Sequence, residues 1–513
     1  MRLRIRGAEW VVAWDGTQHR LLPDGFVVVE DDRIVSIGRT PAGSSPPTRV
    51  DSEIDATGCV VIPGLVSLHS HLASQPLAKG FLEDTGNRRL GGSGLYEYLP
   101  ASRALGGEGA LAALRFAAVE LLQSGCTTVV DLVSSNLGRL DQAPVHDEYI
   151  QILDELGIRA YVCPLFRSAA WYTTNGHEVL YRWDEQAGRE GLRDALRLVE
   201  RAAGRGASRR IQSFLAPAQI DTCSEALLRE TQRAARDLGL RMTIHGAQSQ
   251  VEVREMIRRH GLTSVQWLDR VGLLGPDLIL AHAIFLGHHS DIRWKEGPDE
   301  LALLRESGTA IAHCPWPYVR RGITMETFGR YVRNGLTVGL GTDSCPHDMM
   351  EEMRWAAVVS KALDKDTAIP TAADAFHAAT VGGARALGRD DLGRLAPGCK
   401  ADLVLVRTDR MPMAPVRDPI KSLVYYNANR CVDTVLVDGR VVVRNGRVPD
   451  VDEADLCRRV RAAQVESLAD AATRDWAGRD EWTLSPLSLP LWDGEPTTAS
   501  PAGGDHHPPS RAC

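Results

Sequence analysis

The stretch Pro63-Gly-Leu-Val-Ser-Leu-His-Ser-His-Leu72 places His69 and His71 at the end of an apolar run that follows a Pro-Gly turn signal. In an extended strand, residues two apart project from the same face, so both imidazoles can converge on one point beyond the strand end. Imidazole is a ligand for first-row transition ions such as Zn²⁺. Histidines at this spacing also occur in ordinary polar loops, so the rest of the chain decides whether they bind metal.

Seven further short β-branched runs follow the first, and segments of helical period separate them. The eight runs are residues 65–69, 127–133, 159–166, 211–216, 241–245, 278–282, 309–313 and 336–342. Runs that are apolar on both faces predict a parallel sheet covered by helices, and eight alternations predict a closed barrel. We therefore expect an α/β fold with a (β/α)8 TIM barrel over residues 59–390. An open doubly wound sheet is the alternative that this pattern leaves.

Amphipathic segments between the runs, such as 109–122 and 224–238, predict helices. Ser224 is a suitable N-cap for the second of these, and Gly239 lies just beyond its end.

The flanking segments have the character of antiparallel β-structure. Residues 25–38 predict two strands about an Asp-Asp-Arg turn, and Asp438-Gly439 is a strong hairpin signal between two β-branched runs. We expect residues 1–58 and 391–450 to pair with each other in a small, discontinuous β-sandwich domain. Residues 451–513 predict a helix over 453–473 and then a flexible Pro, Gly and Ser-rich tail, in which His506 and His507 are solvated.

The composition excludes several classes of protein. The 513 residues include 59 Lys and Arg against 66 Asp and Glu, a formal charge of -7, with no basic run suited to nucleic acid. No window reaches the roughly 18 apolar residues of a membrane span, and no signal-peptide core follows the N-terminus, so we expect a cytoplasmic protein with no membrane partner. The ten cysteines are scattered and form no Cys-x-x-Cys pair, which predicts reduced thiols.

Residues able to bind a metal recur where the predicted strands end. In a parallel barrel the active-site groups come from the C-terminal ends of the strands, and random placement would rarely put so many metal-capable residues there. We therefore predict a metal centre at this end of the barrel. The residues are His69 and His71 after the first run, His245 after the fifth, His282 after the sixth, His313 after the seventh and Asp343 after the eighth.

At this point the sequence resembles the amidohydrolase superfamily, and within it the ATZ/TRZ branch of cytosine, guanine and adenosine-type deaminases and triazine chlorohydrolases. The resemblance covers about residues 1–450. It rests on residues 63–71, 217–227, His245, His282, His313-Cys-Pro315, Gly341-Thr-Asp-Ser344, 348–354 and 392–403.

The resemblance implies a mononuclear site in which His69, His71, His245 and Asp343 hold one divalent ion, zinc or iron. A water molecule would occupy the remaining position, where the cation lowers its pKa toward about 7. Asp343 would act as the general base, and His282 would hydrogen-bond the attacking oxygen or polarise the carbon under attack. The resemblance also implies a homodimer.

The chain departs from the deaminase pattern at Gln248. The strand-five histidine of the branch is commonly followed three residues later by a glutamate that protonates the substrate ring, whereas this chain reads His245-Gly-Ala-Gln248. A neutral amide can hydrogen-bond but cannot exchange a proton. Gln248 either binds substrate while another group carries the proton, or the leaving group needs no strong acid, or Gln248 points elsewhere. Glu252, one helical turn on, is a substitute candidate.

Further substrate contacts are predicted around the strand ends. Gln248 and His282 belong to this set, and so do His313, Trp316, Tyr318 and Arg320, because aromatic and arginine side chains after the seventh strand suit a planar anionic ligand. The same group would also suit a dimer surface. Residues 73–107, with Gly91-Gly-Ser-Gly94, predict a mobile lid, and Trp171 and Tyr172 are rim or core residues.

From these residues we predict a metal-dependent hydrolase that acts on a carbon–nitrogen bond of a small heterocyclic substrate, by deamination or a related hydrolytic displacement. Hydrolysis of a cyclic or linear amide is the alternative, with Gln248 as a hydrogen-bond donor. A non-catalytic relative that keeps the scaffold for binding is a third reading; the complete ligand set argues against it and Gln248 argues for it.

Overall fold

The protein is described from a computed structural model that covers residues 1–39, 50–102, 107–133, 143–204, 210–426 and 428–492. Within these residues no helix is long and apolar enough to cross a membrane. The nine cysteines among them are all free. His506 and His507 lie outside the described residues.

The eight predicted runs form strands in two parallel sheets. The first sheet contains β6 (Leu65–Ser70), β7 (Cys126–Val133), β8 (Arg159–Phe166), β11 (Ile211–Gln212) and β12 (Ala216–Pro217), and the second contains β13 (Met242–Gly246), β14 (Leu278–His282), β15 (Ala310–His313) and β16 (Val338–Leu340). The fourth run was expected to be one strand, but it is split into β11 and β12. Between these strands the Ser213 hydroxyl donates to the Val162 carbonyl (2.6 Å), so a side chain holds the chain to β8 there. The eighth run is shorter than expected.

Isolated bridges join the two sheets at both of their edges. Ser70 pairs with Asp343 at one edge, and Leu215 pairs with Met242 at the other. Alternate residues of β6, β7, β8, β14 and β15 share one buried apolar cluster. The C-terminal ends of strands from both sheets therefore lie close together, which is where the predicted metal ligands stand.

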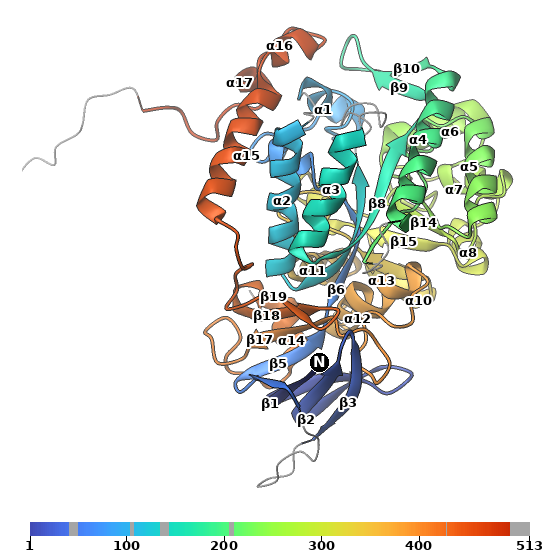
Figure 1. The fold of residues 1–513 in the computed structure, drawn as a ribbon. Helices are drawn as coiled ribbons and strands as arrows, with labels where there is room; N and C mark the ends of the chain where they lie inside the picture. The colour runs from blue at the N-terminus through green and yellow to red at the C-terminus, as the bar shows by residue number, and fades with distance from the viewer. Residues whose placement is uncertain (40–49, 103–106, 134–142, 205–209, 427, 493–513) are drawn as a thin grey trace, which may run out of the picture.

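Helices cover the outside of these sheets (Figure 1). The predicted helix at 224–238 is confirmed: the Ser224 hydroxyl accepts the Leu227 amide (3.2 Å), and Gly239 ends the helix in the left-handed region (φ 63°). The helices that follow the strands are α2 (Gly107–Gln123), α3 (Ala143–Leu156), α4 (Glu185–Gly204), α5 (Glu225–Leu238), α6 (Gln250–His260), α7 (Ser264–Arg270), α8 (Glu300–Ser307), α9 (Pro315–Val319), α10 (Phe328–Arg333), α11 (Met349–Asp364), α12 (Ala372–His377) and α13 (Gly383–Ala386).

A separate eight-stranded sheet takes strands from both flanks of the chain. They are β1 (Arg2–Trp14), β2 (His19–Glu30), β3 (Arg33–Arg39), β4 (Ser52–Asp55), β5 (Cys59–Pro63), β17 (Leu403–Arg407), β18 (Val432–Val437) and β19 (Arg440–Val443). β5 and β17 join the two flanks as antiparallel neighbours. Both predicted hairpins are present, and Asp438 and Gly439 have the positive φ values (48° and 74°) that a tight hairpin turn requires. The sheet encloses an apolar core of its own.

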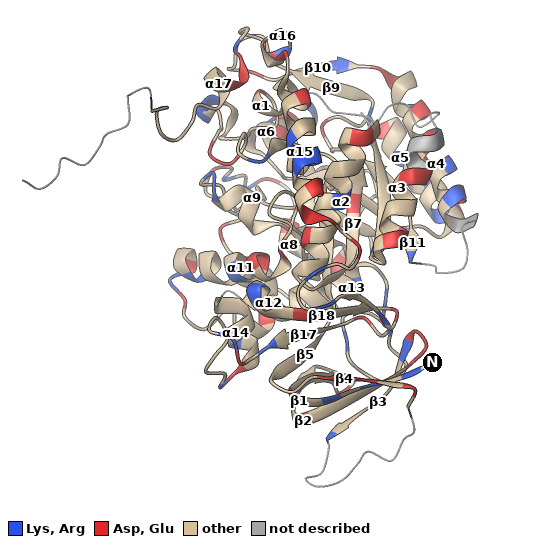
Figure 2. Ribbon diagram, turned by 60° about the vertical axis from the view of Figure 1, so that its left-hand side comes forward, with Lys and Arg blue, Asp and Glu red and all other residues tan. Residues whose placement is uncertain are grey.

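A buried ion cluster connects this sheet to the central strands. The Arg159 guanidinium, only 1% exposed, lies 3.0 Å from a carboxylate oxygen of Asp402 and 2.6 Å from one of Asp438. Elsewhere acidic and basic residues are interspersed along the ribbon, in agreement with the absence of a basic run (Figure 2).

The C-terminal segment runs along the outside of α2 toward the strand ends (Figure 1). It contains α15 (Glu453–Leu468), α16 (Ala471–Arg474) and α17 (Glu481–Leu484). The expected single helix over 453–473 stops at Leu468, because Asp470 adopts a left-handed conformation (φ 57°) that a helix cannot continue. Residues of this segment pack against the turns that follow β6, which include α1 (Tyr98–Ala101) and the short helices Gln75–Ala78 and Arg88–Leu90. The mobility of the 73–107 segment stays a prediction.

Candidate metal and substrate site

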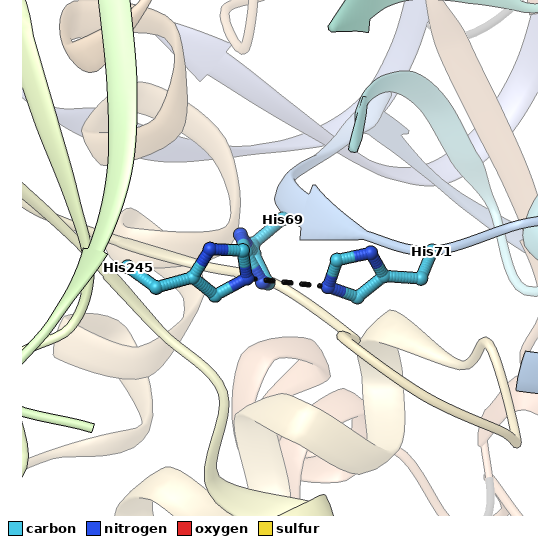
Figure 3. A group of neighbouring side chains, drawn as sticks. All are labelled: His69, His71 and His245. Carbon is cyan, nitrogen blue, oxygen red and sulfur yellow. Dashed lines mark hydrogen bonds between the residues drawn. The ribbon is translucent and has the colours of Figure 1, made fainter. Parts of the chain in front are cut away.

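Four histidines and one aspartate gather at the C-terminal ends of β6, β13, β14 and β16. Their ligand atoms form two groups that can hold a metal ion, in each of which all atoms lie within 4.8 Å of one another. The groups are His69, His71 and His245, drawn in Figure 3, and His69, His282 and Asp343. Asp343 connects them, since its Oδ1 lies 3.5 Å from Nε2 of both His69 and His71.

Backbone carbonyls fix the orientation of two of these imidazoles. Nδ1 of His71 lies 2.8 Å from the Leu132 carbonyl oxygen, and Nδ1 of His245 contacts the Ala218 carbonyl. A carbonyl only accepts, so each Nδ1 carries the ring proton and each Nε2 is left with a lone pair. The two Nε2 atoms nevertheless face each other at 3.3 Å (Figure 3). Convergent lone pairs beside a carboxylate are the arrangement that a bound cation stabilises.

His69 gives a second reason to expect a cation. Its side chain is fully buried, and neither ring nitrogen has a hydrogen-bond partner among the described residues. Buried polar atoms are nearly always paired, so such an orphan needs an explanation. The donor set of imidazole nitrogens and one carboxylate oxygen suits zinc or iron.

Burial and mutual proximity keep the ligands in the form that binds metal. Desolvation, together with the neighbouring histidines, holds the pKa values of His245 and His282 well below the ordinary value, so both rings are neutral at pH 7. Burial raises the pKa of the Asp343 carboxyl, but the His69 imidazole, whose Nε2 lies 3.5 Å from it, and the other nearby histidines outweigh this effect, and the net pKa lies below the usual range. Neutral imidazoles and an ionised carboxylate are the ligand forms that metals require.

A cavity with a volume of about 430 Å³ opens beside these groups. His71, His245 and Asp343 line it on the side of the metal-capable cluster. The rest of the wall comes from the turns after β6, from the ends of β8 and β12, from α9 and from the C-terminal segment; it includes Ser93, Leu99, Leu165, Arg167, Trp171, Gln219, Thr222, Gln248, Tyr318, Arg321 and Ser467.

Gln248 lines the cavity and bonds to a neighbour that is also part of its wall. Its amide nitrogen donates to the Tyr318 hydroxyl (2.6 Å), which in turn lies 3.3 Å from Nε2 of His282. Its amide oxygen is buried without a partner among the described residues.

Glu252 does not line the cavity. Its carboxylate accepts the backbone amides of Ala247 (2.7 Å) and Gln248 (2.8 Å) and the Ser264 hydroxyl (2.6 Å). Burial raises its pKa to about 8. Glu252 therefore holds the backbone at Gln248 from the side that faces away from the cavity, and it does not substitute for the missing acid.

Four of the predicted substrate contacts do not line the cavity: His282, His313, Trp316 and Arg320. Nε2 of His282 lies 3.3 Å from the hydroxyl of Tyr318, which does line it. His313 is stacked against Phe328, and the guanidinium of Arg320 bonds to the Cys345 carbonyl and the Ser344 hydroxyl. Trp316 packs against Trp355 (5.2 Å between ring centroids). The sequence reading grouped Trp316 with Tyr318, but they stand two residues apart in α9, and a helix turns such residues to nearly opposite faces.

Arg167 and Gln219 line the cavity although the sequence did not indicate them, and so does Arg321, the second of the two arginines predicted as ligand contacts after the seventh strand. Arg167 and Gln219 lie just beyond the ends of β8 and β12, which is the signal that identified the histidines. Neither residue type is a usual metal ligand, so a pattern of metal ligands at the strand ends does not include them. Trp171, one of the rim candidates, lines the cavity, whereas its neighbour Tyr172 is 37% exposed and does not.

Comparisons with known proteins agree with this geometry. The family model described as "Amidohydrolase family" matches residues 60–442. The chain is 32% identical over 447 residues to a 5'-deoxyadenosine deaminase from Methanothermobacter thermautotrophicus, covering 86% of this chain and 94% of the relative. It is also 32% identical over 469 residues to a 5-methylthioadenosine/S-adenosylhomocysteine deaminase from Desulforudis audaxviator, with 89% and 97% covered.

Solved structures share the fold at lower sequence identity. An adenosine deaminase from Xanthomonas campestris with bound zinc superposes with a TM-score of 0.75 at 24% identity, covering 90% of this chain and 98% of that one. An atrazine chlorohydrolase from Arthrobacter aurescens, complexed with zinc, gives a TM-score of 0.74 at 23% identity, with 90% and 100% covered.

Proposed function

The chain belongs to the amidohydrolase family, and from that premise we propose that it binds one divalent metal ion through His69, His71, His245 and Asp343 and hydrolyses a carbon–nitrogen bond of a small heterocycle. The observation that carries the proposal is the pair of Nε2 atoms of His71 and His245, which face each other at 3.3 Å beside the Asp343 carboxylate while both Nδ1 atoms contact backbone carbonyls. We propose zinc as the ion, because nitrogen and carboxylate ligands suit it and two structural neighbours carry it; iron is the alternative.

The reaction is an addition of water to the ring carbon that bears the leaving nitrogen, followed by loss of that nitrogen. The ion, when bound, supplies Lewis-acid activation of the water. Asp343 takes a proton from the attacking water and returns it to the leaving nitrogen, so that a C–O bond forms, the C–N bond breaks and ammonia or an amine departs. His282 holds the attacking oxygen or the carbon's substituent by a hydrogen bond.

Gln248 and Tyr318 orient the heterocycle in this scheme. The unpartnered Oε1 of Gln248 accepts from an N–H of the substrate's amino group, while its amide nitrogen is committed to the Tyr318 hydroxyl. The amide cannot supply a proton, so the proton that leaves with the nitrogen comes from Asp343.

Adenosine-type nucleosides are the first substrates to test. Two relatives that match most of this chain are named as deaminases of such compounds, and a cavity of about 430 Å³ falls in the range of small-molecule sites. Gln248 favours a second candidate, hydrolysis of a cyclic or linear amide, because it offers only hydrogen bonds where the deaminase branch has an acid.

Metal content and ammonia release test the proposal together. The purified protein should contain about one zinc or iron per chain and release ammonia from an adenosine-type nucleoside. His71→Asn should lose both metal and activity. His313→Asn, at the end of the neighbouring β15, should keep its metal. Metal-free protein from metal-supplemented cells would exclude the metal site, and turnover of amides alone would favour the second candidate.

We also propose how the sheets are organised. The two parallel sheets, bridged at both edges, form one closed eight-stranded barrel within residues 59–390. The flanking sheet closes over its own core as a sandwich built from residues 1–58 and 391–450. This is supported by the bonds from the Ile34 amide to the Cys399 carbonyl (2.9 Å) and from the Ala401 amide to the Asp32 carbonyl (2.9 Å). Residues 451–513 form a third, C-terminal part.

A further inference from the structure

One wall of the cavity carries an arginine that the proposed reaction does not use. Tyr161, Cys163 and Leu165 alternate along β8 into the buried cluster between the sheets. By the same alternation, Arg167 points to that inner side just beyond the strand end, and it lines the cavity. Its guanidinium lies over the Trp171 ring, 4.7 Å from the centroid.

Arg167 lacks a counter-ion. It makes no ion pair or hydrogen bond with the described residues, and the nearby Asp221 carboxylate is engaged by the Tyr181 hydroxyl (2.6 Å). Desolvation lowers the pKa of Arg167 and outweighs the opposite effect of the nearby Cys223 and Asp221, so the cation is only partly compensated. Arginines that are largely withdrawn from water are normally paired with an acid.

Gln219 stands beside it on the neighbouring strand end. β8 and β12 pair in parallel with Leu165 opposite Ala216, so Arg167 and Gln219 follow adjacent strands. The Gln219 side chain is 5% exposed, lines the same cavity, and its amide nitrogen has no partner among the described residues. The wall thus offers a cation and a second, unsatisfied N–H donor; the backbone of Gln219 is bridged to that of His245.

We propose that Arg167, Gln219 and Trp171 form a subsite that binds a carboxylate on the substrate, away from the nitrogen that leaves. The proposal rests on the proposed function, since it places this group on the heterocycle that the metal-capable cluster attacks. One guanidinium and one neutral amide balance a single negative charge. Arg321, the other arginine on the cavity wall, is held by the Leu82 carbonyl (3.0 and 2.7 Å). A phosphate dianion would leave one charge unmatched within the subsite, so the carboxylate is favoured.

Three nucleosides that differ only at the 5' position separate these possibilities: adenosine, adenosine 5'-carboxylate and adenosine 5'-monophosphate. The holoenzyme should prefer the carboxylate in kcat/KM. Arg167→Met should reduce the ratio of kcat/KM for carboxylate to that for adenosine by about 100-fold, the loss expected when one partner of a buried charge pair is removed. Arg182→Met is the matched control: Arg182 also lies over an aromatic ring, that of Tyr172 (5.3 Å), but does not line the cavity, so the ratio should not change.

Calorimetric titration of the same three compounds gives a readout that does not depend on turnover. Tighter binding of the carboxylate that is lost in Arg167→Met supports the subsite even if no compound is deaminated, in which case only the proposed function fails. Equal binding of carboxylate and adenosine, no binding of any compound, or an unchanged ratio in Arg167→Met would overturn the subsite. A preference for the monophosphate would replace the carboxylate with a phosphate.

Discussion

The side-chain amide nitrogen of Gln248 lies 2.6 Å from the hydroxyl oxygen of Tyr318, and that hydroxyl lies 3.3 Å from Nε2 of His282. An amide NH₂ only donates, so the Tyr318 oxygen accepts from Gln248 and its proton is directed to His282. The residue that departs from the deaminase pattern is therefore an integral part of a hydrogen-bonded row along the cavity wall.

Replacing Gln248 by Glu should impair the native reaction and not improve it. A carboxylate has no N–H for Tyr318, so the hydroxyl turns toward it and releases His282, and a second negative charge enters near Asp343. We expect kcat/KM to fall about 10- to 100-fold with unchanged metal content. Steady-state kinetics and elemental analysis measure the two quantities.

A double-mutant cycle with Tyr318→Phe tests whether Gln248 acts through Tyr318. If it does, Gln248→Glu should cost much less in the Tyr318→Phe background, because the contact is already lost. Fully additive losses, or a gain of deaminase activity in Gln248→Glu, would contradict this account.

Arg479→Ala should loosen the C-terminal segment from the cavity wall. The buried Glu97 carboxylate accepts from the Arg479 guanidinium (2.5 Å) and the Trp476 indole (3.0 Å), and its neighbours Leu95 and Leu99 line the cavity. We expect the free energy of unfolding to drop by about 2 kcal/mol and KM to rise. Arg458→Ala, in an exposed pair with Asp455, should cost less than about 0.5 kcal/mol. Equal losses of stability in the two variants, or an unchanged KM in Arg479→Ala, would refute the proposed role of the C-terminal segment in holding the cavity wall.

Much of the fold follows from local sequence pattern. The runs at 159–166 and 278–282 are strands with the predicted bounds, and Ser224 and Gly239 cap their helix as expected. These features depend on residues that are close together in the sequence, so the sequence alone is enough to predict them. The fourth strand is split at Ser213, where a side-chain hydrogen bond replaces the backbone pairing. The hydrophobic pattern of the sequence does not reveal such an interruption.

The sequence predicts residues of the candidate site only where they lie at the ends of predicted strands. His245, His282 and Asp343 were found because parallel strands bring their C-terminal ends to one edge. The proposed role of Arg167 depends on its having no ion-pair partner among the described residues. The absence of a partner can be recognised only from the three-dimensional structure. Trp316, also predicted as a substrate contact, packs against Trp355 because the short helix α9 turns it away from Tyr318.

Arg159→Met should destabilise the junction of the central strands with the flanking sheet. The substitution leaves the buried Asp402 without its cation and Asp438 with Lys400 alone (3.2 Å), and breaking such a cluster costs about 3 to 5 kcal/mol. Chemical denaturation measures the loss. Arg115→Met, in a surface pair with Glu155, is the control and should change stability by less than about 1 kcal/mol. A small loss in Arg159→Met would mean that the cluster's net contribution is negligible.

Glu300, the first residue of α8, gives the protein a pH-dependent stability that does not involve the metal-capable cluster. Its carboxyl is 5% exposed, lies 2.6 Å from the Thr263 hydroxyl and contacts the Gly287 amide. Burial raises its pKa from 4.5 to about 7. Between these values the folded chain holds a proton that the unfolded chain has released.

The free energy of unfolding must therefore fall as pH rises through this window, because ionisation favours the unfolded chain. A shift from 4.5 to about 7 corresponds to about 3 kcal/mol, lost progressively by about pH 8. Glu300→Gln keeps the shape of the protonated carboxyl and removes its titration. The free energy of unfolding of the variant, relative to that of the wild type, should therefore rise by that amount between about pH 4.5 and pH 8. Urea denaturation across this range measures the difference. Glu306→Gln, on the exposed side of the same helix, should run parallel to wild type, and a parallel course for Glu300→Gln would show that Glu300 ionises at its ordinary pH.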